Sequence, residues 1–114
     1  MNSEMLKGHL DAIVLSVIAS GASYGYAMIK EIRDTTNGVL DLPEGTIYPT
    51  LHRLENRGLI TSRNEVAPSG RKRRVYSLTE TGRHGLKERC DQWMIFSQSI
   101  NSLLRKTKTT AANS

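Results

Sequence analysis

The sequence of 114 residues is poor in cysteine and has no long apolar run. Its single cysteine, Cys90, excludes an intrachain disulfide and a metal site made of four cysteines, and it favours a reducing compartment, the cytoplasm. No stretch of about 18 apolar residues is available to span a membrane. The apolar start of the chain resembles a signal peptide, but it has one early lysine and is interrupted by Asp11, which favours a buried helix instead.

Size and apolar content predict one domain with a modest core. Only 38% of the residues are hydrophobic, which is below the usual share. A small domain that has long helical faces and little to bury often completes its core by oligomerising. No internal repeat is present in the sequence.

The formal net charge is +5, and its distribution along the chain is uneven. Residues 1–43 carry three Lys or Arg against five Asp or Glu, which gives −2. Residues 44–89 carry ten against five (+5), and residues 90–114 carry three against one (+2). A positive surface formed by the middle of the chain indicates a polyanionic partner, with an ordinary solvated surface as the alternative.

Apolar residues spaced three and four apart predict three helices, and two alternating stretches around Pro68 and Gly70 predict a hairpin. The alternating spacing of four and three from Leu86 to Leu104 predicts one long helix with a coiled-coil-like seam. The expected ranges are helices over 5–19, 24–36 and 44 to 56–58, strands over 59–66 and 73–79, a helix over 79–106, and a disordered tail over 107–114.

This order of elements predicts a mainly α fold with a small β-hairpin. Residues 1–78 would form a winged helix-turn-helix, and residues 79–106 would form a C-terminal dimerisation helix. The second helix of a helix-turn-helix pair lies in the DNA major groove. The helix that begins at 44 is therefore the expected recognition helix, and the hairpin is the expected wing.

Three groups of side chains are candidates for DNA contact. Polar groups of the recognition helix can bond phosphates or base edges, with a plain surface helix as the alternative. Four cations at the hairpin tip can reach a phosphate backbone or a minor groove, although strand alternation sends neighbours to opposite faces; the alternative is an edge that blocks sheet aggregation. The tyrosines of "SYGYAMIKEI" flank a helix N-terminus that favours a phosphate, unless their rings pack in the core. The candidates are Tyr24, Tyr26, Thr46, Tyr48, Pro49, His52, Arg53, Arg71, Lys72, Arg73 and Arg74.

Trp93 is the only tryptophan and lies in the middle of the seam of the last helix. An aromatic residue at such a position is usually part of the interface core. The alternative is a flat platform for an aromatic ligand between two subunits, because Ser97 and small residues on the first helix would leave space there.

The sequence resembles the PadR family of transcriptional regulators. The resemblance lies in "YGYAMIKEI", "EGTIYPTLHRLENRGLI" and "GRKRRVYSLTETG", and with the first helix it covers about residues 5–85. The short C-terminal part is similar to the small-chain branch of the family, which includes multidrug-sensing repressors. The resemblance implies a homodimeric repressor that binds double-stranded DNA at a pseudo-palindromic operator, with the last helix and the first helix forming the dimer.

The resemblance also implies a ligand site and no cofactor. In multidrug-sensing members a tryptophan on the last helix lines a flat pore at the dimer centre and stacks on planar drugs. An acidic residue one turn later can attract cationic drugs, but Ser97 occupies that position here, which favours a neutral ligand or none. The implied ligand-binding residues are Met5, Gly8, Ala12, Ser16, Cys90, Trp93, Ser97 and Ile100.

Three other functions have weaker support in the sequence. An enzyme is disfavoured because no nucleophile–base pair, Gly-rich phosphate loop or carboxylate pair is evident, and the three histidines are dispersed. A metal-responsive repressor would need His9 and Cys90 to meet across a dimer interface, where symmetry doubles them to four ligands. A winged-helix adaptor that binds only proteins is disfavoured by the four cations at the hairpin tip.

Overall fold

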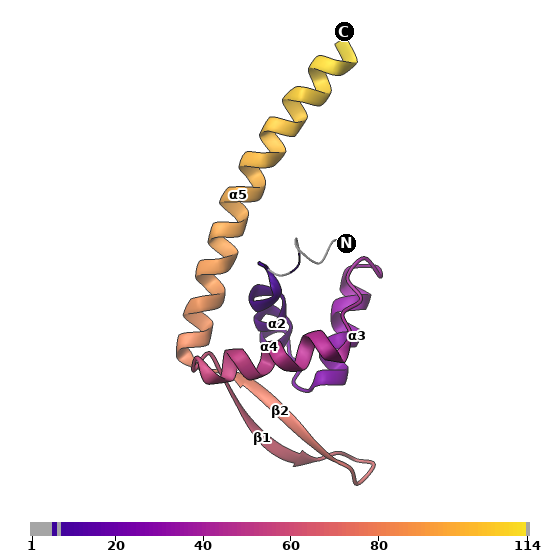
Figure 1. The fold of residues 1–114 in the computed structure, drawn as a ribbon, viewed down its shortest axis with the longest axis vertical. Helices are drawn as coiled ribbons and strands as arrows, with labels where there is room; N and C mark the ends of the chain where they lie inside the picture. The colour runs from indigo at the N-terminus through magenta and orange to yellow at the C-terminus, as the bar shows by residue number, and fades with distance from the viewer. Residues whose placement is uncertain (1–5, 7, 114) are drawn as a thin grey trace.

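The computed structural model describes residue 6 and residues 8–113, and it contains three short helices, a two-stranded hairpin and a long helix in that part of the chain (Figure 1). The long helix projects away from a small domain formed by the other elements, and the molecule measures 64 × 28 × 22 Å. The elements are α2 (Leu10–Ala19), α3 (Gly25–Thr35), α4 (Glu44–Asn56), β1 (Ile60–Val66), β2 (Lys72–Leu78) and α5 (Glu80–Asn113).

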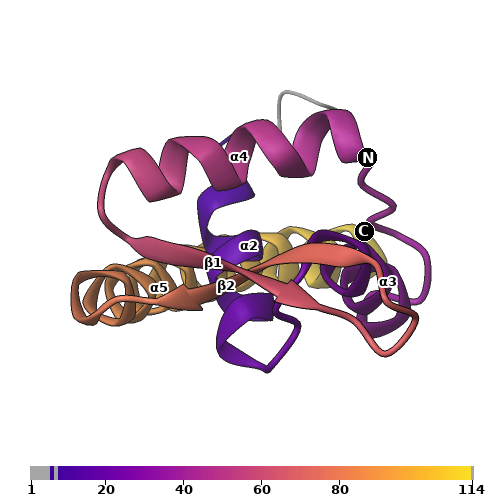
Figure 2. The ribbon, with the colours of Figure 1, turned by 90° about the horizontal axis from the view of Figure 1, so that it is seen from below.

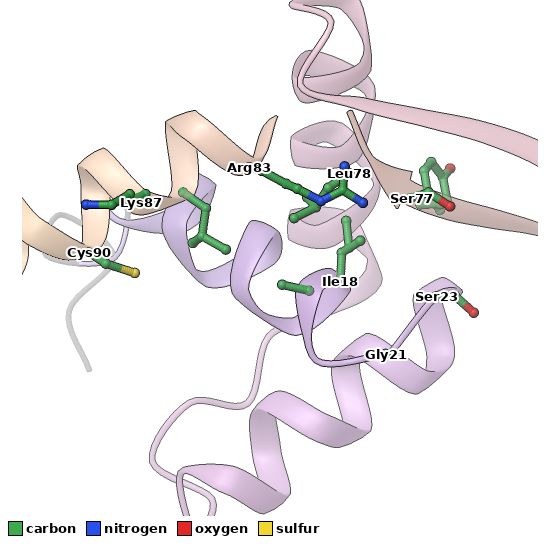
Figure 3. Close-up of a pocket in the computed structure, with 11 residues that line it drawn as sticks. Ile18, Gly21, Ser23, Ser77, Leu78, Arg83, Lys87 and Cys90 are labelled. Atoms are coloured by element: carbon green, nitrogen blue, oxygen red, sulfur yellow. The ribbon is translucent and has the colours of Figure 1, made fainter. Parts of the chain in front are cut away.

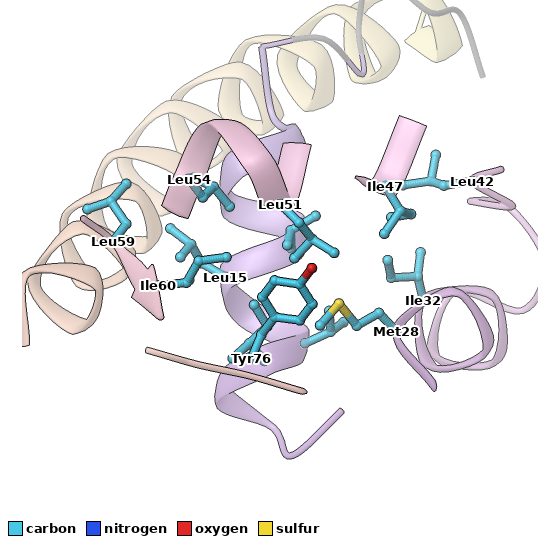
Figure 4. Packing of buried hydrophobic residues seen from close by; sticks show 13 residues of the cluster. Leu15, Met28, Ile32, Leu42, Ile47, Leu51, Leu54, Leu59, Ile60 and Tyr76 are labelled. Atoms are coloured by element: carbon cyan, nitrogen blue, oxygen red, sulfur yellow. The ribbon is translucent and has the colours of Figure 1, made fainter. Parts of the chain in front are cut away.

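The core forms around α2, whose Val14 and Leu15 are fully buried. Met28 of α3 and Leu51 of α4 reach it from two sides, and Tyr76 of β2 closes it from a third (Figure 4). Burial raises the pKa of the Tyr76 phenol above its ordinary value. The whole cluster consists of Val14, Leu15, Val17, Ile18, Met28, Ile32, Leu42, Ile47, Leu51, Leu54, Leu59, Ile60 and Tyr76.

The two strands pair antiparallel, from Ile60 opposite Leu78 to Val66 opposite Lys72. The loop between them is closed by the amide of Ala67, which donates to the carbonyl of Arg71 at 2.8 Å. Gly70 adopts φ +87° in this loop, a conformation that glycine reaches without strain. The hairpin predicted from alternation and turn residues is confirmed, with each strand boundary within one residue.

The first helix predicted from the sequence is interrupted near its start. The sequence predicted one helix over 5–19; in the structure Leu6 is helical, the amide of His9 closes a turn on the carbonyl of Leu6 at 2.8 Å, and α2 begins at Leu10. Gly8 lies in this turn, and glycine is a poor helix former. Met5 lies outside the described residues.

The last helix begins as its cap residue requires and ends later than expected. The hydroxyl of Thr79 accepts a hydrogen bond from the amide of Gly82 at 3.0 Å and donates to the carbonyl of Gly58 at 2.6 Å. The helix then continues to Asn113, so helix replaces the disordered tail predicted over 107–114 as far as residue 113. Residues 107–113 contain no proline or glycine, and nothing in their sequence forces the helix to stop. In the described part of the chain, no helix is both long and apolar enough to cross a membrane.

Gly82 permits the close packing of α5 on the chain that leads into β1. A Cβ atom at Gly82 would overlap the backbone carbonyl of Leu59. We expect Gly82→Ala to lower the free energy of unfolding by about 1–3 kcal/mol, because backbone atoms must move to accept the methyl group. Gly45→Ala is the control, since a Cβ at that helical position meets no atom within 4 Å. Urea unfolding followed by circular dichroism measures both; equal effects of the two substitutions would contradict the packing argument.

Candidate nucleic-acid interface

One side of α4 is free of the core and lies beside the hairpin. Ile47, Leu51 and Leu54 are buried, and the opposite side of the helix presents Pro49 and His52 to solvent. Seen from below, α4 and the hairpin occupy the same side of the molecule, and β1 contacts α4 (Figure 2). Helical periodicity therefore separates a core face from a face on which a partner can lie.

Tyr48 connects α4 to the start of α3. The residue is 46% exposed, and its hydroxyl lies against Gly25, the first residue of α3. A side chain at Gly25 would overlap that phenol, so the glycine between the two tyrosines of "SYGY" is needed for this contact. The half-exposed phenol of Tyr48 and the N-terminus of α3 consequently lie next to each other.

The hairpin is held against the start of α3 by one of its four cations. The guanidinium of Arg73 lies over the Tyr24 ring at 4.1 Å from its centroid, and its Nη2 is 3.5 Å from Glu65 Oε1. In addition, the amide of Tyr76 donates to the carbonyl of Ser23 at 2.7 Å. Cation–π contact, ion pair and hydrogen bond together fix the hairpin relative to the helix-turn-helix.

The other three cations at the tip remain exposed: Lys72 and Arg74 flank Arg73 on β2 and point to the other face of the strand, whereas Arg71 precedes the strand. Arg71 and Lys72 are exposed, and Arg74 is exposed while its Nη1 lies 3.4 Å from Asn64 Oδ1. The run of four cations therefore divides into Arg73, which positions the hairpin, and three groups that face solvent.

The remaining candidates for DNA contact differ in exposure. Tyr26 is 68% exposed on α3, whereas Tyr24 is half-buried beneath Arg73. Thr46 is half-buried, and its carbonyl accepts the Thr50 hydroxyl at 2.9 Å.

Arg53 lies on the flank of α4 that faces away from the hairpin and towards α2. Its Nη2 is 2.6 Å from Asp11 Oδ1, and the same carboxylate is 3.5 Å from Arg57 Nη1 and 3.6 Å from Arg89 Nη2. The sequence predicts Arg53 as a DNA contact; in the structure its guanidinium pairs with Asp11, and its side chain remains 42% exposed. His52, the residue before Arg53, points to the exposed side of α4 opposite the core, whereas Arg53 lies on the flank.

The implied ligand-binding residues lie where α2 and α5 meet. Trp93 is 49% exposed, contacts the His9 ring edge-on at 5.1 Å between centroids, and lies 6.2 Å from the Phe96 ring. Gly8, Ser16 and Cys90 are exposed, Ala12 and Ser97 are half-buried, and Ile100 is 37% exposed. Met5 cannot be placed, because it lies outside the described residues.

An open groove of about 670 Å³ lies between the end of α2, β2 and the first turns of α5 (Figure 3). Its floor is largely apolar and includes Ile18, Leu78 and Leu86, while Arg83, Lys87 and Cys90 line its α5 side. The groove is separate from the exposed side of α4. Among the residues that the structure describes, no three or more His, Cys, Asp or Glu side chains gather as metal ligands would.

Comparison with known proteins agrees with this geometry. The model of the Transcriptional regulator PadR-like family matches residues 14–88. The chain belongs to this family. A crystal structure of a PadR-like transcriptional regulator from Bacillus cereus superposes with a TM-score of 0.78 at 32% identity, covering 90% of this chain and 97% of that one.

Two named relatives are longer proteins. Transcriptional regulator YqjI of Escherichia coli is 35% identical over 95 residues, which are 83% of this chain and 44% of that protein. Negative transcriptional regulator PadR of Bacillus subtilis is 25% identical over 87 residues, which are 76% of this chain and 46% of that protein. The chain thus spans less than half the length of each. It is a DNA-binding winged-helix transcriptional regulator of the PadR-like family and not an enzyme.

Sequence patterns did not reveal three side-chain contacts of this site. The stacking of Arg73 on Tyr24, the contact of His9 with Trp93 and the ion pairs of Asp11 all join residues from different elements. One signal was available for Asp11, since it is a charged residue inside an apolar helix and such a residue needs a partner.

We expect Arg73→Ala to loosen the hairpin from α3. Loss of the stacking on Tyr24 and of the ion pair with Glu65 removes two of the contacts that hold β2 near Ser23. Amide hydrogen exchange at Tyr76, measured by NMR, should become about three- to tenfold faster. Arg71→Ala is the matched control, because the same change at an exposed tip residue should leave this exchange rate unaltered. Similar acceleration in both variants would show that Arg73 does not hold the hairpin.

Proposed function

We propose that this regulator is a cytoplasmic homodimeric repressor that binds a pseudo-palindromic operator and is released by a small planar ligand near Trp93. The observation that carries the DNA-binding part is the common position of three features on one side of the molecule. These are the exposed side of α4, the N-terminus of α3 and the exposed cations of the hairpin.

On DNA, α4 would enter the major groove with His52 and Pro49 towards the base edges. Tyr48, Tyr26 and the N-terminus of α3 would lie at a phosphate, since a helix N-terminus and phenol hydroxyls both suit an anion. Arg71, Lys72 and Arg74 would contact the backbone beside the groove. Arg53 pairs with Asp11, but its side chain is 42% exposed, so it stays a candidate phosphate contact at the flank of α4.

A dimer is supported by the apolar side of α5. Trp93 is 49% exposed, Ile100 37% and Leu104 61%, and these residues follow one another along the seam predicted from the sequence. An exposed apolar stripe of this length on a soluble regulator favours burial against a second copy. Further exposed apolar residues broaden the stripe on both sides, namely Met94, Phe96 and Leu103.

Ligand release would follow from the position of Trp93 between two subunits. A planar molecule stacked on Trp93 favours one separation of the two α5 helices, and only such differential affinity can shift an equilibrium between dimer geometries. Two recognition helices must lie about 34 Å apart to enter successive major grooves. A ligand that changes this separation releases the operator. Repression is supported by the Bacillus subtilis relative, which is named a negative transcriptional regulator.

The first test is fluorescence anisotropy with a labelled duplex from upstream of the protein's own gene and with a scrambled duplex, each at about 50 and 200 mM salt. Selective binding that persists at the higher salt is expected. His52→Ala should reduce the ratio of operator to scrambled affinity by about fivefold or more. Arg71→Ala should weaken both complexes alike and lower the salt slope by about one.

His84→Ala is the control for these variants, because His84 is an exposed histidine on α5 and is not among the candidate DNA contacts. If both duplexes bind equally and this binding disappears at the higher salt, the interface is a basic surface that binds DNA without sequence specificity. Absence of binding at either salt would favour a protein-binding adaptor.

Trp93→Ala should keep operator binding and abolish release by a planar ligand, because the substitution removes the stacking surface but not the recognition helix. Candidate ligands are identified by quenching of Trp93, the only tryptophan, and release is measured by anisotropy of the preformed complex. Ile95→Ala is the matched control, since Ile95 is 67% exposed and lies on the opposite side of α5. If the Trp93→Ala variant is monomeric in analytical ultracentrifugation, Trp93 is instead mainly a part of the interface core.

A further inference from the structure

Asp11 and three arginines form a cluster that joins three helices. Asp11 lies in the first turn of α2, and its side chain is 18% exposed. Arg53 and Arg57 reach it from the end of α4, and Arg89 reaches it from α5. One carboxylate thus binds guanidinium groups of the recognition helix and of the long helix at once. We call these four residues the Asp11 cluster.

The geometry around Arg89 directs it into the cluster. Its Nη1 donates to the carbonyl of Gly85 at 3.1 Å, one turn earlier on α5, while its Nη2 lies 3.6 Å from Asp11 Oδ2. Gly85 leaves room for this path, because a Cβ there would come within 3.0 Å of Arg89 Nη1. The arginine therefore lies along its own helix and spans the gap to α2.

The charges of the cluster make its arrangement depend on the single carboxylate. Three guanidinium groups against one carboxylate leave a net charge of +2 within the cluster. Without the negative charge the three cations repel one another across a small distance. Arg89 is the member of the cluster that belongs to α5, the helix that projects from the domain.

Small changes at this position have large effects further along α5. Arg89 and Leu104 are 15 residues apart, which is about 22 Å of helix, so a rotation of about 10° at Arg89 displaces Leu104 by about 4 Å. The apolar stripe that follows Arg89 carries the proposed dimer contacts. The angle between α5 and α4 therefore determines where the second recognition helix lies.

We infer that Asp11 is a positioning residue for operator choice. By holding Arg53 and Arg57 of α4 and Arg89 of α5 on one carboxylate, it sets the separation of the two recognition helices and so selects the spacing between operator half-sites. This inference rests on the proposed homodimeric binding of a two-part operator. Asp11 itself does not contact DNA.

The test uses Asp11→Asn, which keeps the shape of the side chain and removes its charge. Asp91→Asn is the matched control, because it changes the net charge by the same amount at an ion pair within α5, where Asp91 Oδ2 lies 3.0 Å from Lys87 Nζ. Arg89→Gln is a second variant that leaves Asp11 paired with Arg53 and Arg57. Thermal unfolding by circular dichroism verifies that each variant is folded.

The duplex that the wild-type chain selects from a random library is the probe, together with versions whose half-sites are one or two base pairs closer or further apart. Competition anisotropy should show a sharp spacing preference for wild type and Asp91→Asn. Asp11→Asn and Arg89→Gln should each reduce the preference for the selected spacing over a one-base-pair change by about threefold or more. Equal weakening of every duplex, or a preference like that of wild type, would overturn the positioning role.

A second measurement does not depend on DNA. Energy transfer from Trp93 to a dye on a cysteine introduced at Asn56, with Cys90→Ser, reports the distance between α5 and the end of α4. Asp11→Asn and Arg89→Gln should change its efficiency and Asp91→Asn should not. If the two variants change the transfer efficiency but the wild-type chain shows no spacing preference, the proposed operator binding alone is refuted. If the transfer efficiency of the variants equals that of wild type, the role of Asp11 is refuted.

Discussion

The buried face of α2 is the constraint on which the rest of the structure depends. Helix α2 contacts α3, α4, β2 and α5, and its Val14 and Leu15 are fully buried. The relative positions of these four elements are fixed because each packs on the same apolar surface of α2. The opposite side of α2 stays open beside Trp93 and carries Ala12 and Ser16, so one short helix both organises the core and borders the proposed ligand site.

The side of the molecule proposed to face DNA is fixed by contacts among its own polar residues. Tyr48 rests on Gly25, and Arg73 rests on Tyr24, so recognition helix, second helix and hairpin are joined at one point. Positions that resemble DNA contacts in the sequence thus have two kinds of role. Arg73 and Arg53 are engaged by other residues of the protein, Tyr24 and Asp11, whereas His52 and Arg71 are exposed on its surface.

Local patterns in the sequence predicted the elements well, because helical spacing and strand alternation are properties of neighbouring residues. The sequence predicted a continuous first helix, but a turn at Gly8 and His9 separates the helical Leu6 from α2. The predicted end of α5 was wrong, since a polar tail without proline or glycine can continue a helix. Side-chain pairing was beyond local patterns: Arg53 and Arg57 are 42 and 46 positions from Asp11. A family resemblance correctly indicated the regulator, but it could not show which arginines pair with residues of the protein itself.

In the proposed dimer, the length of α5 beyond Phe96 couples the folding of this half of the helix to assembly. In the described structure this half of the helix lies away from the core, and Leu103 and Leu104 remain mostly exposed. An isolated helix of this size is marginal in water, because a costly nucleus is repaid only by propagation and packing. The helical content of this half should therefore increase with protein concentration. Occupancy of DNA would then rise more steeply with expression level than a preformed dimer would allow, which gives the regulator a threshold set by helix formation itself.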